Sequence, residues 1–102
     1  MKTLLAVLAS AALLAQDRGT IRGNVTDPTG AAVPAASVTA QNVDTGLRQA
    51  TVSGADGTFN LPYLPAGNYS LTTEHTGFRK SEITGLRVNV ATVTGVDVTL
   101  SI

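Results

Sequence analysis

The sequence contains no cysteine, no tryptophan and a single histidine among its 102 residues. Without cysteine the chain has no disulfides and no thiolate ligands for zinc. His75 would have to serve alone in any zinc site or Ser-His-Asp triad, and no Gly-x-Ser-x-Gly nucleophile motif accompanies it. We therefore expect no catalytic residues and no metal site, with His75 as an exposed or turn-packing imidazole.

Charge of either sign is also sparse, with seven basic and seven acidic side chains spread along the chain. A nucleic-acid-binding protein needs a basic face that neutralises phosphates, and scattered cations cannot form one. No polybasic stretch or amphipathic helix suggests binding to a membrane surface. The charge pattern therefore excludes nucleic acid as a partner.

Three aspartates, Asp27, Asp44 and Asp56, lie in turn-forming segments. Hard cations such as calcium bind oxygen ligands from loops of this kind, but no Asp-x-Asp-x-Asp loop is present. Each carboxylate has a sufficient role in capping its own turn. No Gly-rich loop opens a helix to hold a phosphate either, so we expect no cofactor.

One long apolar run stands at the start of the chain. Lys2 is followed by eleven residues from Leu4 to Leu14, interrupted only by Ser10, and the small Ala15 precedes a polar segment. This layout is typical of a secretory signal peptide. As a helix the run would reach about 16 Å, too short for a hydrocarbon core of about 30 Å, which disfavours a membrane anchor. A buried helix is the other alternative.

The sequence therefore predicts a signal peptide over residues 1–15 and one exported domain over residues 16–102, with no transmembrane span. Without Lys2 the mature chain keeps six of its seven basic residues against seven acidic ones. We expect it in the periplasm, at the outer membrane or outside the cell.

From Gly19 onward, short alternating runs are separated by turn residues, a pattern typical of a β-sandwich. Turns are indicated at Asp27-Pro28-Thr29-Gly30, at Asp44-Thr45-Gly46 and at Asp56-Gly57. Seven or eight strands fit between the turns. The runs are 20–26, 37–43, 47–53, 58–61, 68–75, 78–84, 86–90 and 96–102.

The four aromatic side chains divide into two groups. Phe59 and Tyr69 occupy inward positions of their runs and are expected in the core. Tyr63, between Pro62 and Pro65, and Phe78, beside Gly77, are the only candidates for an exposed ligand platform. The alternative is that both cover the open ends of the core. Two prolines also exclude the segment 62–67 from a central strand.

The turn motifs, taken in order, resemble the carboxypeptidase regulatory-like domain. They are Gly23-x-Val25-x-Asp27-x-x-Gly30, Ala36-x-Val38, Asp56-Gly57-x-Phe59, Leu64-Pro65-x-Gly67-x-Tyr69-x-Leu71, Gly77-Phe78 and Val98-x-Leu100. The resemblance implies an all-β fold, a seven-stranded antiparallel Greek-key sandwich of prealbumin (transthyretin-like) type. It implies no peptidase chemistry, since the domain takes its name from following a catalytic domain. Asp56, Gly57, Pro65 and Gly67 are then structural turn residues.

Similar domains stand directly after the signal peptide in bacterial TonB-dependent outer-membrane receptors, and this chain has the same layout. The resemblance therefore implies a non-catalytic interaction or scaffold module of the cell envelope. The runs Val96–Ile102 and Thr20–Thr26 are regular enough to pair as sheet edges with envelope proteins or with identical copies. The alternative function is a carbohydrate-binding sandwich that uses Tyr63 and Phe78.

Overall fold

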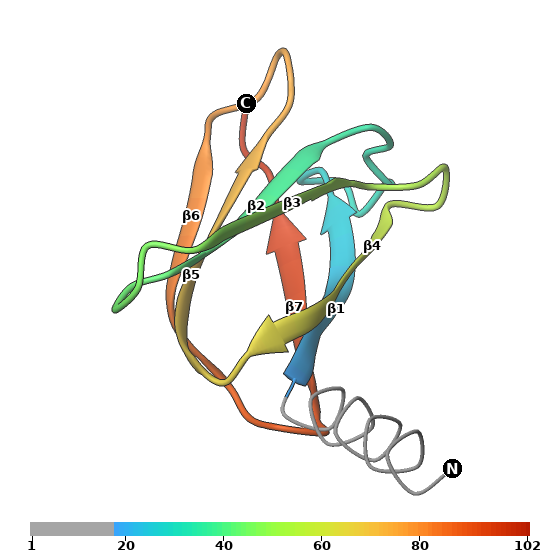
Figure 1. The fold of residues 1–102 in the computed structure, drawn as a ribbon. Coiled ribbons are helices and arrows are strands. Elements are labelled where there is room, and N and C mark those ends of the chain that lie inside the picture. Colours follow the sequence, from blue (N-terminus) through green and yellow to red (C-terminus); the bar gives the residue numbers. More distant parts are fainter. Residues whose placement is uncertain (1–17) are drawn as a thin grey trace, which may run out of the picture.

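The computed structural model describes residues 18–102, so the signal peptide expected at residues 1–15 lies outside the described part. The described residues form seven strands and no helix (Figure 1). None of them forms a helix that could cross a membrane. The strands are β1 (Arg18–Thr26), β2 (Ser37–Asn42), β3 (Arg48–Val52), β4 (Thr58–Pro65), β5 (Gly67–Glu74), β6 (Ser81–Val88) and β7 (Val93–Thr99).

The strands form a three-stranded sheet A, in the order β4-β1-β7, and a four-stranded sheet B, in the order β3-β2-β5-β6. Figure 1 shows the two sheets as layers, with β3 of sheet B crossing in front of β1 and β7 of sheet A. The predicted all-β sandwich is confirmed. Its pairs are antiparallel except for β1 and β7, which are parallel.

The prediction that Thr20–Thr26 offers a free edge is wrong. These residues belong to β1, which pairs with β4 on one side and with β7 on the other. The central position explains why Ile21 and Val25 are completely buried. The other predicted edge, Val96–Ile102, overlaps β7, which does stand at the end of its sheet.

The core lies between the sheets and is filled by aliphatic side chains from alternate strand positions, as the period-two pattern requires. Phe59 and Tyr69 are 3% and 1% exposed, as predicted. The Tyr69 hydroxyl donates to the carbonyl oxygen of Pro65 at 2.6 Å, which satisfies its one polar group. Burying each large apolar side chain contributes about 1.5–3 kcal/mol.

Asp56 and Gly57 lie in the turn between β3 and β4, and Gly67 begins β5 directly after Pro65 ends β4. The Asp56 carboxylate accepts hydrogen bonds from the Thr58 hydroxyl at 2.6 Å and the Thr58 amide at 3.1 Å. Gly57 has φ +81°, and a Cβ there would lie 2.6 Å from the Val25 carbonyl oxygen. A Cβ on Gly67 would lie 2.8 Å from the side-chain nitrogen of buried Asn42. Both glycines therefore permit close packing of the backbone.

All seven strands differ from the expected runs at one end or both, and β4 and β6 differ most. The runs expected at residues 78–84 and 86–90 merge into β6, because Gly85, at φ +72°, forms a bulge that keeps both halves in one strand. The run expected at 58–61 continues as β4 through Pro65. β4 is an edge strand, so it tolerates Pro62.

Candidate functional site

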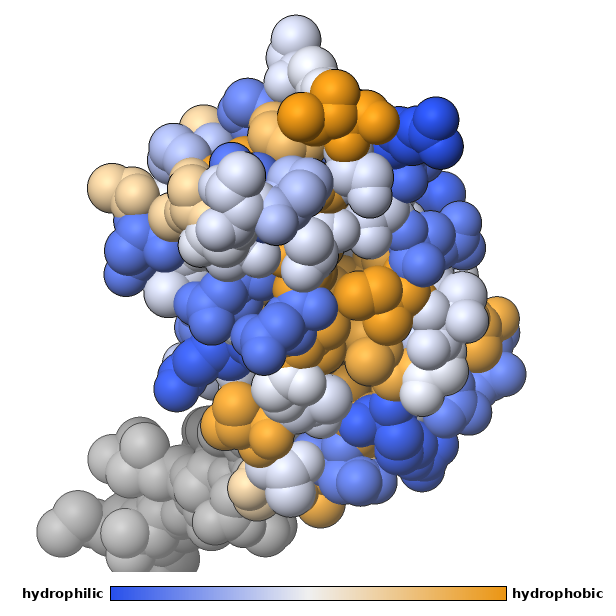
Figure 2. Space-filling view, turned by 180° about the vertical axis from the view of Figure 1, so that it is seen from behind, coloured by the Kyte–Doolittle hydropathy of each residue, from blue (hydrophilic) through white to orange (hydrophobic). Residues whose placement is uncertain are grey.

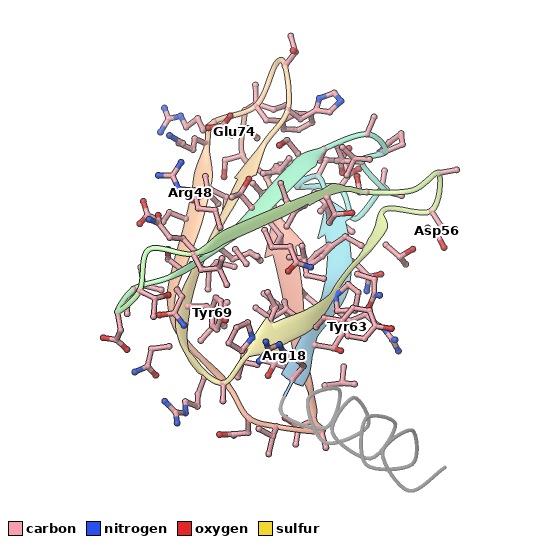
Figure 3. The ribbon with its side chains drawn as sticks, viewed as in Figure 1. Arg18, Arg48, Asp56, Tyr63, Tyr69 and Glu74 are labelled. Carbon is pink, nitrogen blue, oxygen red and sulfur yellow. The ribbon has the colours of Figure 1, made fainter. Side chains whose placement is uncertain are left out.

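Tyr63 occupies a β-bulge at the end of β4. In the pairing of β4 with β1, Ile21 faces Leu61 and Gly19 faces Leu64, so Pro62 and Tyr63 together face one residue, Thr20. The extra residue gives Tyr63 a φ of +60° and turns its ring outward, leaving it 71% exposed. In Figure 3 Tyr69 points between the sheets, whereas Tyr63 lies outside them.

A non-glycine residue in the left-handed region costs about 1–2 kcal/mol and persists only where the surroundings impose it. The surroundings here include Gln49 on β3, whose side-chain amide donates to the Pro62 carbonyl oxygen at 2.7 Å. This bond joins the edge of sheet B to the bulge in sheet A. Gln49 therefore fixes the backbone that presents Tyr63.

Two more large apolar side chains are exposed at the same end of the sandwich. Val93, 58% exposed, is the partner of Thr20 in β7, on the opposite side of β1 from Tyr63. Val90, 49% exposed, lies in the β6–β7 loop, where the Ala91 amide donates to the Arg18 carbonyl oxygen. We call Tyr63, Val90 and Val93 the Tyr63 surface.

A polar ladder covers the rest of the outer face of sheet A. The Arg22 Nε donates to the Asn60 side-chain oxygen at 3.2 Å. The side-chain amide of Asn24 donates to the Asp97 carboxylate at 3.3 Å. Arg22, Asn24 and Asn60 line a hollow of about 480 Å³ beside β4. Its amide and guanidinium groups are suited to hydroxyl-rich or carbonyl-rich ligands.

Phe78 lies at the other end of the molecule. It follows β5, and the adjacent Arg79 amide donates to the Ser101 carbonyl oxygen beyond the end of β7. Because β7 runs parallel to β1, this end is opposite the start of β1, where Tyr63 lies. The two predicted platform residues therefore do not come together, and each would have to bind a ligand separately.

Phe78 is half-buried against the core, with His75 edge-on at 5.8 Å between ring centroids. The hollow beside them has a volume of about 500 Å³, and its lining includes Glu74 and Lys80, which form an exposed ion pair at 3.3 Å. Figure 3 shows Glu74 on this side, away from Tyr63. The His75 Nδ1 contacts the Thr76 carbonyl oxygen at 2.9 Å, as a turn-packing imidazole would.

The turn carboxylates are engaged in their own loops. Hydrogen bonds from the Thr29 hydroxyl and from local backbone amides lower the pKa of Asp27 from its ordinary 3.8, although desolvation opposes the shift. Bonds from the hydroxyl and amide of Thr58 likewise lower the pKa of Asp56. Across residues 18–102, no three His, Asp or Glu side chains lie close enough together to hold a metal ion.

The sequence made Tyr63 one of two candidates for an exposed ring, beside the alternative that it covers the core, and it did not point to Gln49 or the polar ladder. The contacts of these residues depend on how distant strands pair. The alternation of apolar and polar residues along a single strand carries no information about that pairing. The two prolines flanking Tyr63 indicated an irregular backbone, and that was the only local sign of the bulge.

A family model, described as the carboxypeptidase regulatory-like domain, matches residues 20–101. No curated protein sequence matches the chain. Among solved structures, the TIE protein of Bacillus anthracis aligns with TM-score 0.66 at 15% identity, over 83% of this chain and 16% of that one. A Bacteroides uniformis protein proposed to bind carbohydrate aligns with TM-score 0.64 at 18% identity, over 79% and 40%.

The 3-chlorocatechol 1,2-dioxygenase of Rhodococcus opacus aligns with TM-score 0.62 at 13% identity, over 83% of this chain and 59% of that one. The chain thus spans less than two thirds of the length of each of these three proteins. At these identities the likeness shows the sandwich fold alone.

Proposed function

The chain belongs to the carboxypeptidase regulatory-like domain family, and from that premise we propose that it is a non-catalytic interaction module of the bacterial cell envelope. The module is exported by the segment 1–15 and acts in the periplasm or at the outer membrane, as the N-terminal domain of a TonB-dependent receptor does. It works by contact with other proteins.

The exposed Tyr63 is the observation that carries this proposal. A bulge and a bond from Gln49 hold this ring in solvent, and the chain keeps a backbone conformation that is unfavourable for tyrosine. Tyrosine is enriched among the residues that dominate binding energy at protein interfaces. Val93 and Val90 add apolar area around it, while the polar ladder supplies hydrogen bonds at the rim.

The direct test is site-specific photocrosslinking of the full chain in cells, with a photoreactive residue in place of Val93, which lies across β1 from Tyr63 on the same surface. We expect a discrete crosslinked envelope protein whose yield falls at least about tenfold when Tyr63→Ala is added. Val52→Ala is the matched control, since Val52 is 62% exposed on β3 and lies outside the Tyr63 surface. A crosslink unaffected by Tyr63→Ala, or none at all, would reject this surface as the docking site.

Carbohydrate binding is the second candidate function. The hollow lined by Arg22, Asn24 and Asn60 favours it, because side chains with paired donors and acceptors suit vicinal hydroxyls. The exposed Tyr63 ring on the same outer face could stack on a sugar. A glycan array probed with the exported chain, with Tyr63→Ala as control, tests this function. Absence of glycan binding, or binding indifferent to Tyr63→Ala, would eliminate it.

A further inference from the structure

The four edge strands of the sandwich are protected to different degrees. β4 carries the bulge at Pro62 and Tyr63, and β6 carries the bulge at Gly85. β3 is only five residues long and begins with exposed Arg48. Bulges, prolines, short length and charged side chains are the devices by which proteins prevent edge-to-edge pairing. Three edges therefore carry protection.

β7 has no bulge, no proline and no basic side chain, and it is seven residues long. It pairs with β1 through all seven residues in unbroken register. Its one charge, Asp97, is held by the Asn24 side chain on the outer face. The Thr94 hydroxyl donates to the Arg87 carbonyl oxygen of β6 at 3.1 Å, and this bond uses a side chain. Within residues 18–102, no strand pairs with the backbone edge of β7.

The hydrogen bonds between β7 and β1 show which backbone groups of β7 point to its free edge. The Thr20 amide donates to Thr92 and the Leu100 amide donates to Thr26, so the even-numbered residues of β7 face β1. Because alternate residues of a strand bond to opposite neighbours, the backbone groups of the odd-numbered residues point to the free side. These residues are Val93, Gly95, Asp97 and Thr99, and all four are exposed.

We propose that β7 pairs antiparallel with β7 of a second copy about a twofold axis at Val96, making one continuous six-stranded sheet. This rests on the proposed function, in that it assigns one partner of the interaction module. Three antiparallel registers bond odd-numbered residues near the centre of the strand. One centred on Asp97 would place the two carboxylates opposite each other, which is destabilising. One centred on Gly95 would leave the end of β7 unpaired.

The register centred on Val96 avoids both faults. It pairs all seven residues of β7 and places Thr94 opposite the second copy's Val98 on the inner face. Asp97 then lies opposite the second copy's Gly95, which has no side chain to clash with the carboxylate. β-Branched residues facing each other are favourable cross-strand pairs. The interface is isologous and closes as a dimer.

The neighbouring surface supports the same twofold axis. Phe78, Ile83 and Leu86 are half-buried and pack against the core at the open side of the sandwich. Figure 2 shows apolar surface in a hollow in the middle of this face, surrounded by polar residues. Strand β6 contains the run Glu82-Ile83-Thr84-Gly85-Leu86-Arg87, with an acid at its start and a base at its end. When two copies of this run lie antiparallel, the Glu82 of each faces the Arg87 of the other. A twofold axis at Val96 turns the two β6 strands toward each other, acid toward base.

Gly95 provides the test, because a Cβ at this position meets no atom within 4 Å and a side chain does not disturb the monomer. Gly95→Asp sets two new carboxylates against Asp97 across the axis, and Gly95→Lys sets two ammonium groups there instead. Sedimentation equilibrium of the full exported chain should give a dimer that Gly95→Asp weakens and Gly95→Lys strengthens, each about fivefold. Urea unfolding of the two variants checks that the monomer is intact.

Cysteine crosslinking adds a geometric check, since the chain has no cysteine of its own. Gly95→Cys combined with Asp97→Cys should give a covalent dimer on mild oxidation, whereas Thr58→Cys combined with Asn60→Cys on the β4 edge should not. A monomer at all concentrations up to about 1 mM, or a dimer indifferent to charge at position 95, overturns the proposal. Because Val93 also lies on β7, the product crosslinked from position 93 is identified by its mass. An envelope protein reports on the Tyr63 surface and a homodimer reports on the β7 pairing, so either idea can fail alone.

Discussion

The side-chain amide of Gln49, on the edge of sheet B, donates to the carbonyl oxygen of Pro62, on the edge of sheet A, at 2.7 Å. The bond satisfies a carbonyl in the β4 bulge and so connects the two layers at the residue before Tyr63. A side chain that makes one such bond contributes about 1 kcal/mol.

Replacing Gln49 should therefore loosen Tyr63 as well as the fold. We expect Gln49→Ala to lower the free energy of unfolding by about 1 kcal/mol and to speed amide hydrogen exchange around residues 62–64. Gln41→Ala, on the outer face of β2, is the control and should leave exchange in β4 unchanged. Equal effects of the two variants would mean that Gln49 contributes only general packing.

The strain at Tyr63 can be separated from its function. Tyr63→Gly and Tyr63→Ala both remove the ring, but only glycine adopts φ +60° without penalty. We expect Tyr63→Gly to be more stable than Tyr63→Ala by at least about 0.5 kcal/mol in urea unfolding, while both lose the partner crosslink. Equal stability of the two variants would show that the bulge relaxes when the ring is absent.

Thr73 offers a stabilising substitution. Its hydroxyl oxygen is buried and, in the described part of the chain, has no hydrogen-bond partner. A buried polar group without a partner is destabilising, and valine has nearly the same shape. Thr73→Val should raise the free energy of unfolding by about 1 kcal/mol. Thr72→Val, at the half-exposed neighbouring position, serves as the control and should change stability little.

Two glycines with similar φ separate backbone strain from steric overlap. Gly57 has φ +81°, and a Cβ added there would lie 2.6 Å from the Val25 carbonyl oxygen, whereas a Cβ on Gly46, at φ +78°, would meet nothing within 4 Å. Gly46→Ala should lower stability by about 1 kcal/mol, from strain alone. Gly57→Ala should lower it by about 3 kcal/mol or more, since β1 and the turn must also separate. Equal losses would contradict the overlap.

Acid should weaken the fold through its turns. Folding lowers the pKa of Asp27 and Asp56 below the ordinary 3.8, because both carboxylates accept hydrogen bonds from a threonine hydroxyl and backbone amides. A depressed pKa stabilises the folded state above the unfolded pKa, and that contribution disappears as pH falls through the folded value. The urea midpoint should therefore drop below about pH 4, and less steeply in Asp27→Asn/Asp56→Asn. An unchanged pH profile would contradict the coupling.

The sequence predicted those parts of the fold that are encoded locally. Asp56-Gly57 and Pro65-x-Gly67 mark turns whatever the strands do, and the inward positions of Phe59 and Tyr69 follow from alternation along one strand. Pairing between strands is not local, so β1 was expected at an edge although it is central. For the same reason Tyr63 and Phe78, fifteen residues apart in a short chain, were grouped together and lie at opposite ends.

The parallel register of β1 and β7 also determines how the domain responds to force. Its described part enters at Arg18 and leaves beyond Thr99, at opposite ends of the same two hydrogen-bonded strands. Tension between those points would shear the whole β1–β7 ladder, loading its bonds together instead of opening them one after another. Forced unfolding is governed by the unfolding rate, which such a ladder makes slow. Placed between two other domains of a longer chain, this domain would therefore unfold slowly when the chain is stretched.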